Sequence, residues 1–398
     1  MVEILGENLV AHIPTTPFSA FSGPRDARVL LVGEAWGETE QMLRKPFSGE
    51  SGKELFLMLG EAMPQVSPEL HSEATSQFRY GHAWVKPREA WLQAAGIAMT
   101  NVFNLRPAAN KIETLCGSKA EVGGQEYKLP HLSQGKYVRP EFLPEVDRLF
   151  KEIWEVKPNL IVLLGNTACW AVLQQTNIGS IRGTITKSGA FCAERDNWIK
   201  AIGTYHPAGM MRQWSWRTII ITDLIKAGRE GQFPEIRRPA RQVTISPTLV
   251  ECEAWVRDVL ANPPPLLSVD IETEGGQIKC VGFGRSRTEA FIIPFLDKAK
   301  PTYSHWPTAG EERRAWDLCE ALLSSPIPKL FQNGVYDLQY LLRAGLRIAA
   351  CHHDTMLLHH SWFPEMLKGL GFLGSVYTDE PAWKLMRLAK ADTTKADE

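Results

Sequence analysis

Short apolar runs alternate with amphipathic stretches through the first 230 residues of the chain. The apolar runs begin near residues 29, 97, 160 and 199, and each is short enough to be a buried strand. Between them, apolar side chains recur at helical spacing, as in Leu55 and Leu59 and again from Phe142 to Ile153. Alternation of strands with helices is typical of a parallel sheet covered by helices on both faces. The pattern therefore predicts an α/β fold of three layers, α/β/α.

A second pattern follows residues 231–247, which are basic, contain several prolines and show no helical period. It predicts three strands as an antiparallel meander, then a helix, a short strand and a second helix. In order, these elements are expected at 266–271, 278–283, 290–295, 310–323, 329–332 and 335–343. This order resembles the ribonuclease H-like α/β fold.

We therefore predict two domains, covering residues 1–232 and 262–398, with a linker and leading helix over 233–261. Within the first domain, residues 1–28 are expected to form an N-terminal arm. Residues 111–140 are rich in Gly, Lys and Pro, and we expect an insertion or long loop there.

Composition narrows the class of protein. The 398 residues are 44% hydrophobic and 22% charged, as in a soluble globular protein, and the net charge is −1. Any nucleic-acid contact must therefore come from local basic patches. The apolar runs are too short for a membrane span, and the N-terminus lacks the pattern of a secretory signal. Seven scattered cysteines without a C-x-x-C pair suggest a reduced compartment, and we expect the protein in the cytoplasm.

The stretch from Val29 to Leu59 carries the strongest functional signal. Its strand ends in Gly33-Glu34-Ala35-Trp36-Gly37, Glu40 follows, and a second turn reads Pro46-Phe47-Ser48-Gly49 with Gly52 behind it. Loops after the carboxyl ends of strands bind ligands in open α/β sheets. The stretch resembles motif one of the uracil-DNA glycosylase superfamily, most closely its family four, with the pattern GE-x-PG-x-x-E and then PF-x-G-x-x-G. Trp36 stands where that family usually has proline.

The resemblance implies roles for individual residues. Phe47 would stack on a flipped base, Asn101 would read its edge, and His206, in a Tyr-His-Pro stretch, would donate to a base oxygen. Glu34 and Glu40 are the candidates for activating water. Gly33, Ala35 and Trp36 would line the pocket. Ordinary structural roles, such as a core phenylalanine or acids at a helix N-terminus, are the alternatives.

The loop after His206 is expected to contact DNA. In the family, the equivalent loop carries a wedge that enters the duplex. Apolar tips can fill a vacated stack while arginines meet phosphate. The candidates are Met210, Met211, Arg212 and Arg217. The loop does not match the basic, histidine-containing insert of the cross-linking branch of the superfamily, so we expect turnover rather than a covalent product. Ordinary loop packing is the alternative.

Family-four glycosylases hold an iron–sulfur cluster with four cysteines, two of them upstream of motif one. Here no cysteine precedes Cys116. We therefore expect no iron–sulfur cluster, and the glycosylase step itself needs no cofactor.

The second domain carries a carboxylate pattern. Asp270 and Glu272 lie two apart on a predicted strand and so share a face. Asp337 closes Asn333-Gly334-Val335-Tyr336-Asp337, which resembles the second motif of the 3′-5′ exonucleases joined to family A DNA polymerases. The resemblance implies a two-metal site for Mg²⁺ or Mn²⁺. The family's third motif, Y-x-x-x-D, has no match after Tyr377, so we expect the nuclease domain to be incomplete.

These patterns predict a DNA glycosylase for uracil or a modified pyrimidine, fused to a partial 3′-5′ exonuclease domain. The expected partners are DNA and a separately encoded DNA polymerase, and the expected source is a phage or phage-like element. Two alternatives stay open. One is a non-catalytic sensor of uracil or a modified base that serves a polymerase. The other is an active metal-dependent exonuclease with a degenerate glycosylase domain.

Overall fold

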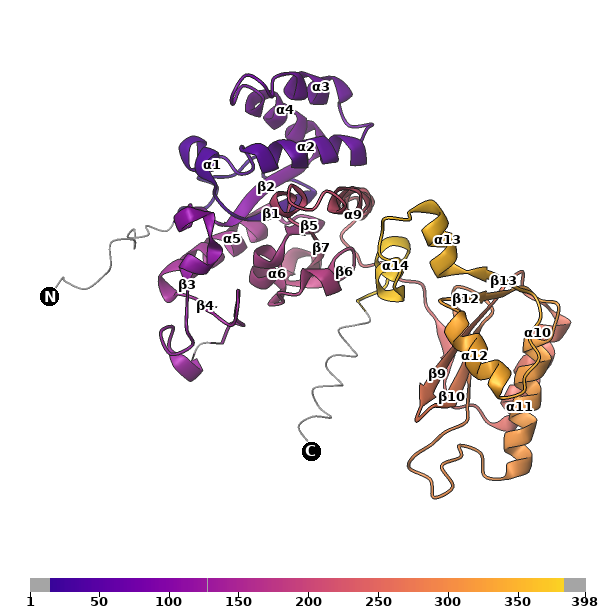
Figure 1. The fold of residues 1–398 in the computed structure, drawn as a ribbon. Helices are drawn as coiled ribbons and strands as arrows, with labels where there is room; N and C mark the ends of the chain where they lie inside the picture. The colour runs from indigo at the N-terminus through magenta and orange to yellow at the C-terminus, as the bar shows by residue number, and fades with distance from the viewer. Residues whose placement is uncertain (1–14, 127, 383–398) are drawn as a thin grey trace. The chain divides into compact units, whose positions relative to one another are not determined.

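The structure is a computed structural model, and it describes residues 15–126 and 128–382 (Figure 1). The chain divides into two compact units. The first unit runs to Arg237 and includes the chain from Gly374 onward, and the second unit is Arg238–Leu373. The predicted division had placed residues from Gly374 onward in the second domain. Residues 1–14 of the expected N-terminal arm and residues 383–398 of the predicted second domain lie outside the described residues.

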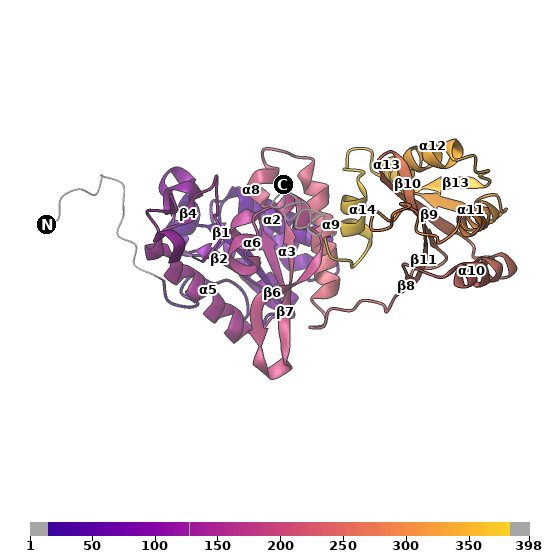
Figure 2. The same ribbon diagram turned by 90° about the horizontal axis from the view of Figure 1, so that it is seen from below.

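The first unit is built on a five-stranded sheet with the order β2-β1-β5-β7-β6. These strands are Ile97–Phe103, Val29–Ala35, Leu160–Leu164, Asn197–Thr204 and Ile185–Cys192. Their pairs are parallel except for β6 with β7, which form an antiparallel pair (Figure 2). The parallel strands are almost entirely buried, as expected for a sheet covered on both faces.

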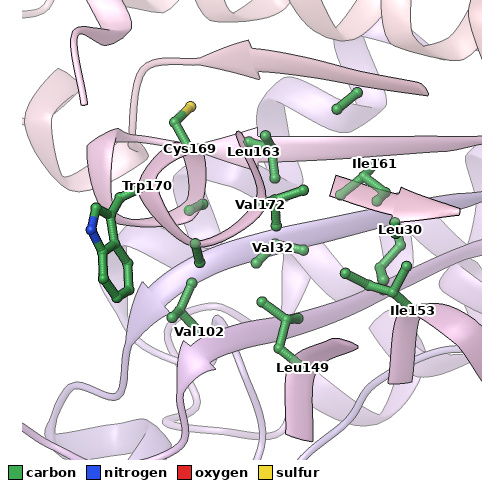
Figure 3. Close-up of a cluster of buried hydrophobic side chains, with 14 of the residues drawn as sticks. Leu30, Val32, Val102, Leu149, Ile153, Ile161, Leu163, Cys169, Trp170 and Val172 are labelled. Carbon is green, nitrogen blue, oxygen red and sulfur yellow. The ribbon is translucent and has the colours of Figure 1, made fainter. Parts of the chain in front are cut away.

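Helices cover both faces of this sheet. On one face, α5 (Leu143–Val156) and α6 (Asn166–Leu173) pack their apolar side chains on alternate residues of the strands (Figure 3). Leu30 and Val32 of β1 belong to that cluster, because side chains of a strand alternate between faces. On the other face, α2 (Glu50–Ala62) packs against α9 (Trp216–Glu230). The predicted three-layer α/β/α fold is confirmed.

Shorter elements connect these layers. They are α1 (Glu38–Leu43), α3 (Pro68–Ser76), α4 (Val85–Ala95), α7 (Ile178–Ile181) and α8 (Pro207–Met210). The expected insertion is folded into short 3-10 turns and a two-stranded pair, β3 (Cys116–Gly117) with β4 (Tyr137–Val138). Leu115, Cys116 and Val138 join the main core, which explains why this segment is ordered without a helical or strand period.

The second unit contains a six-stranded sheet with the order β13-β12-β9-β10-β11-β8. In that order the strands are Cys351–Asp354, Lys329–Phe331, Leu267–Glu274, Gln277–Gly284, Glu289–Pro294 and Gln242–Thr244. Strands β9, β10 and β11 form an antiparallel meander. The edge strand β8 pairs in parallel with β11, although its sequence had been assigned to the linker. Three residues are too few to show a strand period in the sequence. They form a strand because they pair with β11.

The helices of this unit are α10 (Leu249–Ala261), α11 (Ala309–Leu323), α12 (Val335–Arg343) and α13 (Thr355–Trp362), and α14 (Leu370–Tyr377) runs across the division into the first unit. Side chains of α10 and α11 pack on β9, β10 and β11 in one core. Among the described residues, no helix is both long enough and apolar enough to cross a membrane.

A buried ion network fixes α5 to the edge strand β2. Arg148 is 2% exposed, and its guanidinium donates to Glu145 at 3.1 Å and to Glu152 at 2.7 Å. It also donates to the backbone carbonyls of Asn101, at 2.6 Å, and Val102, at 2.8 Å. The network thus pairs three buried charges and satisfies two backbone carbonyls of β2.

Replacing Arg148 with alanine should destabilise the protein strongly, by about 3–5 kcal/mol, because two buried carboxylates would lose their cation. Urea denaturation of the full chain measures this change. Arg195→Ala is the matched control, since Arg195 is exposed and also donates to backbone carbonyls. Equal losses of unfolding free energy in the two variants would show that the buried network does not stabilise the protein more than a surface arginine does.

Candidate active site

The site is organised at the carboxyl edge of the first sheet. Strand register places Gly33 of β1 directly beside Asn101 of β2. The parallel strands β5 and β7 end at the same edge and lead into Gly165 and His206. A Cβ atom built on Gly165 would lie 3.0 Å from the Cβ of His206, so these two loops touch. Four segments far apart in sequence therefore meet at one place.

Gly33 lets an aromatic ring and an amide approach the backbone. A Cβ atom at this position would lie 2.3 Å from Oδ1 of Asn101 and 2.4 Å from Cζ of Phe47. Only a residue without a side chain permits both contacts. The ring of Phe47 also lies over the ring of His206, with centroids 6.3 Å apart and planes inclined by 28°. Phe47, Asn101 and His206 therefore gather around Gly33.

Phe47 has an unusual backbone conformation. Its φ is +52°, in the left-handed region, which costs a bulky L-residue roughly 1–2 kcal/mol. The buried Arg88 donates to its carbonyl oxygen. On the other side, Glu40 accepts hydrogen bonds from the backbone N–H groups of Ser48 and Gly49, each at 2.8 Å. The surroundings hold the strained turn in place.

These contacts change the interpretation of Glu40. Its carboxylate is buried, and it also accepts from the N–H of Gly37 at 3.1 Å. Three backbone donors occupy its oxygens, and it links α1 to the Phe47 turn. The sequence could not separate this structural acid from a catalytic one, because Glu34 and Glu40 both lie close to the end of the same strand.

Glu34 has a different environment. Its side chain is only partly buried, and one carboxylate oxygen accepts a hydrogen bond from the hydroxyl of Thr167, in the first turn of α6. The hydroxyl of Thr167 therefore holds this carboxylate oxygen beside the N-terminus of α6. Sequence reasoning missed Thr167, although Gly165-Asn166-Thr167 follows an apolar strand in the same way as the Gly33 loop does.

His206 caps α8, and its ring is held in one orientation. Nδ1 accepts from the N–H of Ala208 at 3.2 Å, so the proton of the neutral ring lies on Nε2. Burial lowers the pKa of His206, while the carboxylates of Glu34 and Glu40 raise it to a smaller extent. Since the net shift is downward from an ordinary value of 6.5, the ring is neutral at pH 7 and Nε2–H is a donor.

Asn101 presents its amide beside this donor. The side chain is 2% exposed, and Nδ2 has no hydrogen-bond partner among residues 15–126 and 128–382. A buried amide N–H without a partner is costly unless a ligand satisfies it. The indole N–H of Trp36 is in the same condition, and Trp36 is 5% exposed. Two donors near the end of β1 and β2 are therefore available.

The loop after His206 differs in part from expectation. Met210 is fully buried, and both ends of the Arg217 guanidinium are held by Glu61. We therefore withdraw these two residues from the predicted DNA contacts. Met211 is 52% exposed and Arg212 is also exposed. Trp214, which the sequence analysis did not single out, is 65% exposed and forms the largest apolar surface of this loop.

In the second unit, Asp337 faces the backbone rather than an open site. It is 3% exposed and accepts from the N–H of Ile271 at 2.9 Å. Burial raises its pKa to about 6, and the carboxylates of Asp270 and Asp354 add to the rise. Asp354 caps α13. Among the described residues, no three His, Cys, Asp or Glu side chains are arranged to hold a metal ion. The predicted set of Asp270, Glu272 and Asp337 does not fit a metal in this arrangement.

Comparison with known proteins identifies the family of the first unit. The model of the Uracil DNA glycosylase superfamily matches residues 20–225, which is more than half of the 398-residue chain. The chain belongs to the uracil DNA glycosylase superfamily. A Type-4 uracil-DNA glycosylase from Archaeoglobus fulgidus is 24% identical over 226 residues, which cover 54% of this chain and 83% of the relative. The resemblance seen in motif one is therefore confirmed at the level of the superfamily.

Solved structures of the EXD2 exonuclease domain are also similar to part of the chain. The structure soaked in Mn and GMP is 18% identical with a TM-score of 0.22, covering 35% of this chain and 70% of that one. The structure soaked in Mn and dGMP is 17% identical with a TM-score of 0.23, covering 39% of this chain and 86% of that one.

The environment of Asp337 generates a prediction about stability and pH. Its pKa is about 6 in the folded protein and 3.8 for an ordinary aspartate. Between these values the folded chain binds more protons than the unfolded chain, so this group's contribution to stability is lost as pH rises through 6. Asp337→Asn should therefore stabilise the chain at pH 7 and have a smaller effect at pH 4.

Urea denaturation of wild type and variant over pH 4–8 gives the difference directly. Asp317→Asn is the control, because Asp317 lies exposed on α11 of the same unit. A free-energy difference between wild type and Asp337→Asn that does not change with pH would refute the raised pKa.

Proposed function

We propose that the first unit hydrolyses the N-glycosidic bond of uracil or a modified pyrimidine in DNA. The observation that carries the proposal is the gathering of Phe47, Asn101 and His206 around Gly33, with Glu34 at the same sheet edge. An aromatic face, an amide, a neutral imidazole donor and a carboxylate are the groups that this reaction needs. Membership of the superfamily supports the same conclusion.

Each group would act on a different part of the flipped nucleotide. The base would stack on Phe47 and pair its edge with the amide of Asn101. As the C1′–N1 bond breaks, its electron pair moves to the base, and Nε2–H of His206 would stabilise the developing oxyanion. Glu34 would stabilise the cation-like sugar and orient water toward C1′. Thr167 would hold Glu34 in place. The water supplies oxygen to the sugar, and its proton leaves toward Glu34 or the departing base.

Glu40 is not part of this catalytic set in our proposal. Its three backbone donors give it a structural function, namely to fix the turn that carries Phe47. Trp36 would bring a large buried wall and an indole N–H to a position where the family usually has proline. This difference is the reason for including modified pyrimidines among the substrates.

Excision should be measured on end-labelled DNA with one uracil, in EDTA, followed by alkali. Wild type should give strand breakage at that position alone. His206→Ala and Glu34→Gln should each lower kcat by about 100-fold or more, because each removes a group that faces developing charge. Glu38→Gln is the matched control, since Glu38 is 84% exposed and its nearest cation, Arg106, is 3.7 Å away.

Tight binding of uracil-containing DNA without any base release would favour the sensor instead. Modified pyrimidines at the same position test the wider substrate range. Repeating the reaction with Mg²⁺ tests the second unit. A ladder that shortens from the 3′ end, abolished in Asp270→Asn, would establish an active exonuclease. A polymerase partner, a cytoplasmic location and a phage source stay predictions from the sequence.

Trp214 should matter for duplex DNA and little for single strands. An apolar tip that fills the vacated stack is needed only where a stack exists. Trp214→Ala should therefore raise KM for uracil in a duplex by about tenfold and leave single-stranded uracil nearly unchanged. Trp198→Ala is the control, because Trp198 is also exposed, at 40%, but lies on β7. Equal loss on both substrates would rule out a wedge function.

A further inference from the structure

The turn that carries Phe47 is held by a buried cation from a distant helix. Arg88 lies on α4 and has no exposed surface. Its Nη1 donates to the carbonyl oxygen of Pro46 at 3.1 Å and to that of Phe47. Its Nη2 donates to Glu89 at 2.7 Å. One guanidinium therefore spans two consecutive carbonyls while a neighbouring carboxylate balances its charge.

We propose that Arg88 is a positioning residue for the stacking ring of Phe47. By fixing the Pro46 and Phe47 carbonyls it keeps Phe47 in the left-handed conformation that directs the ring toward Gly33 and His206. This inference rests on the proposed function, because Arg88 would position the side chain on which the base is proposed to stack.

The carbonyl of Phe47 has little freedom on its other side. A Cβ atom built on Gly52, in the first turn of α2, would lie 2.0 Å from this oxygen. The oxygen is therefore confined between the backbone of α2 and the guanidinium of Arg88. Since the orientation of a peptide plane sets the dihedral angles of its neighbours, fixing this oxygen fixes the direction in which the Phe47 side chain leaves the backbone.

The geometry requires arginine in particular. A planar guanidinium can reach two carbonyls and a carboxylate together, whereas a lysine ammonium is a single point of charge. The guanidinium also lies over the ring of Trp84, 5.1 Å from its centroid. Burial lowers the pKa of Arg88, and its Nε has no partner among the described residues. A buried cation that is incompletely satisfied suggests a function other than packing.

A double-mutant cycle tests whether Arg88 acts through Phe47. Arg88→Lys alone should lower kcat for uracil excision by about tenfold per folded molecule, with little change in KM, because the ring is displaced from the base. In a Phe47→Ala background the same change should cost less than about twofold, since the ring is already absent. A purely structural role would give losses that multiply.

Controls separate this inference from the proposed function. Lys200→Gln removes another fully buried cation, paired with Glu230 at 2.9 Å, and should leave kcat per folded molecule unchanged. If the Arg88 variants do not fold, Gly52→Ala displaces the same carbonyl from its other side and should give the same coupling to Phe47→Ala.

Base flipping, read from 2-aminopurine fluorescence beside uracil, gives a second readout. The wild type could flip the base without excising it, while the Arg88 and Phe47 variants show coupled losses of flipping. That outcome would keep the positioning role and refute the glycosylase. Excision with losses that multiply would keep the glycosylase and overturn the positioning role. Neither excision nor flipping by wild type would overturn both.

Discussion

The site depends on a place where the backbone has no side chain. Gly33 lies near the carboxyl end of β1, and both Phe47 and Asn101 occupy the space that a Cβ atom would fill there. The strand register that pairs Gly33 with Asn101 brings the amide to this point. Any larger residue would separate the aromatic face from the amide, so the approach of these two side chains depends on one glycine.

Around this point, buried charges act mainly on backbone atoms. Arg88 holds carbonyls of the Phe47 turn, Glu40 holds its amides, and Arg148 holds the carbonyl of Asn101. Burying such charges has a large desolvation free energy, and apolar side chains of similar volume often stabilise a protein equally or more. Charged groups, however, fix the direction of individual peptide planes, which apolar side chains cannot do. The arrangement therefore favours precise positioning of the site over a larger free energy of unfolding.

The sequence predicted the fold of the first unit well because its strands are short apolar runs separated by helical periods. The resemblance to the family's motifs also singled out Phe47, Asn101 and His206. The structure brings these three side chains together around Gly33, and their roles stay predictions. The sequence could not find Arg88, which lies 41 residues from Phe47 and meets it only through tertiary packing. For the same reason it chose Met210 over Trp214. Both are apolar and close in sequence, and only packing buries one and exposes the other.

Glu34 and Glu40 carry the same carboxylate but have different surroundings. They are six residues apart, Glu34 near the end of β1 and Glu40 in the first turn of α1, and both carboxylates raise the pKa of His206. Three backbone N–H groups saturate the carboxylate of Glu40, and burial keeps water from it. Glu34 is partly exposed and is oriented by the hydroxyl of Thr167 on one oxygen. A carboxylate that is held yet open to solvent can orient a water molecule. In the proposed reaction Glu34 therefore orients the water, and Glu40 supports the turn on which the base would rest.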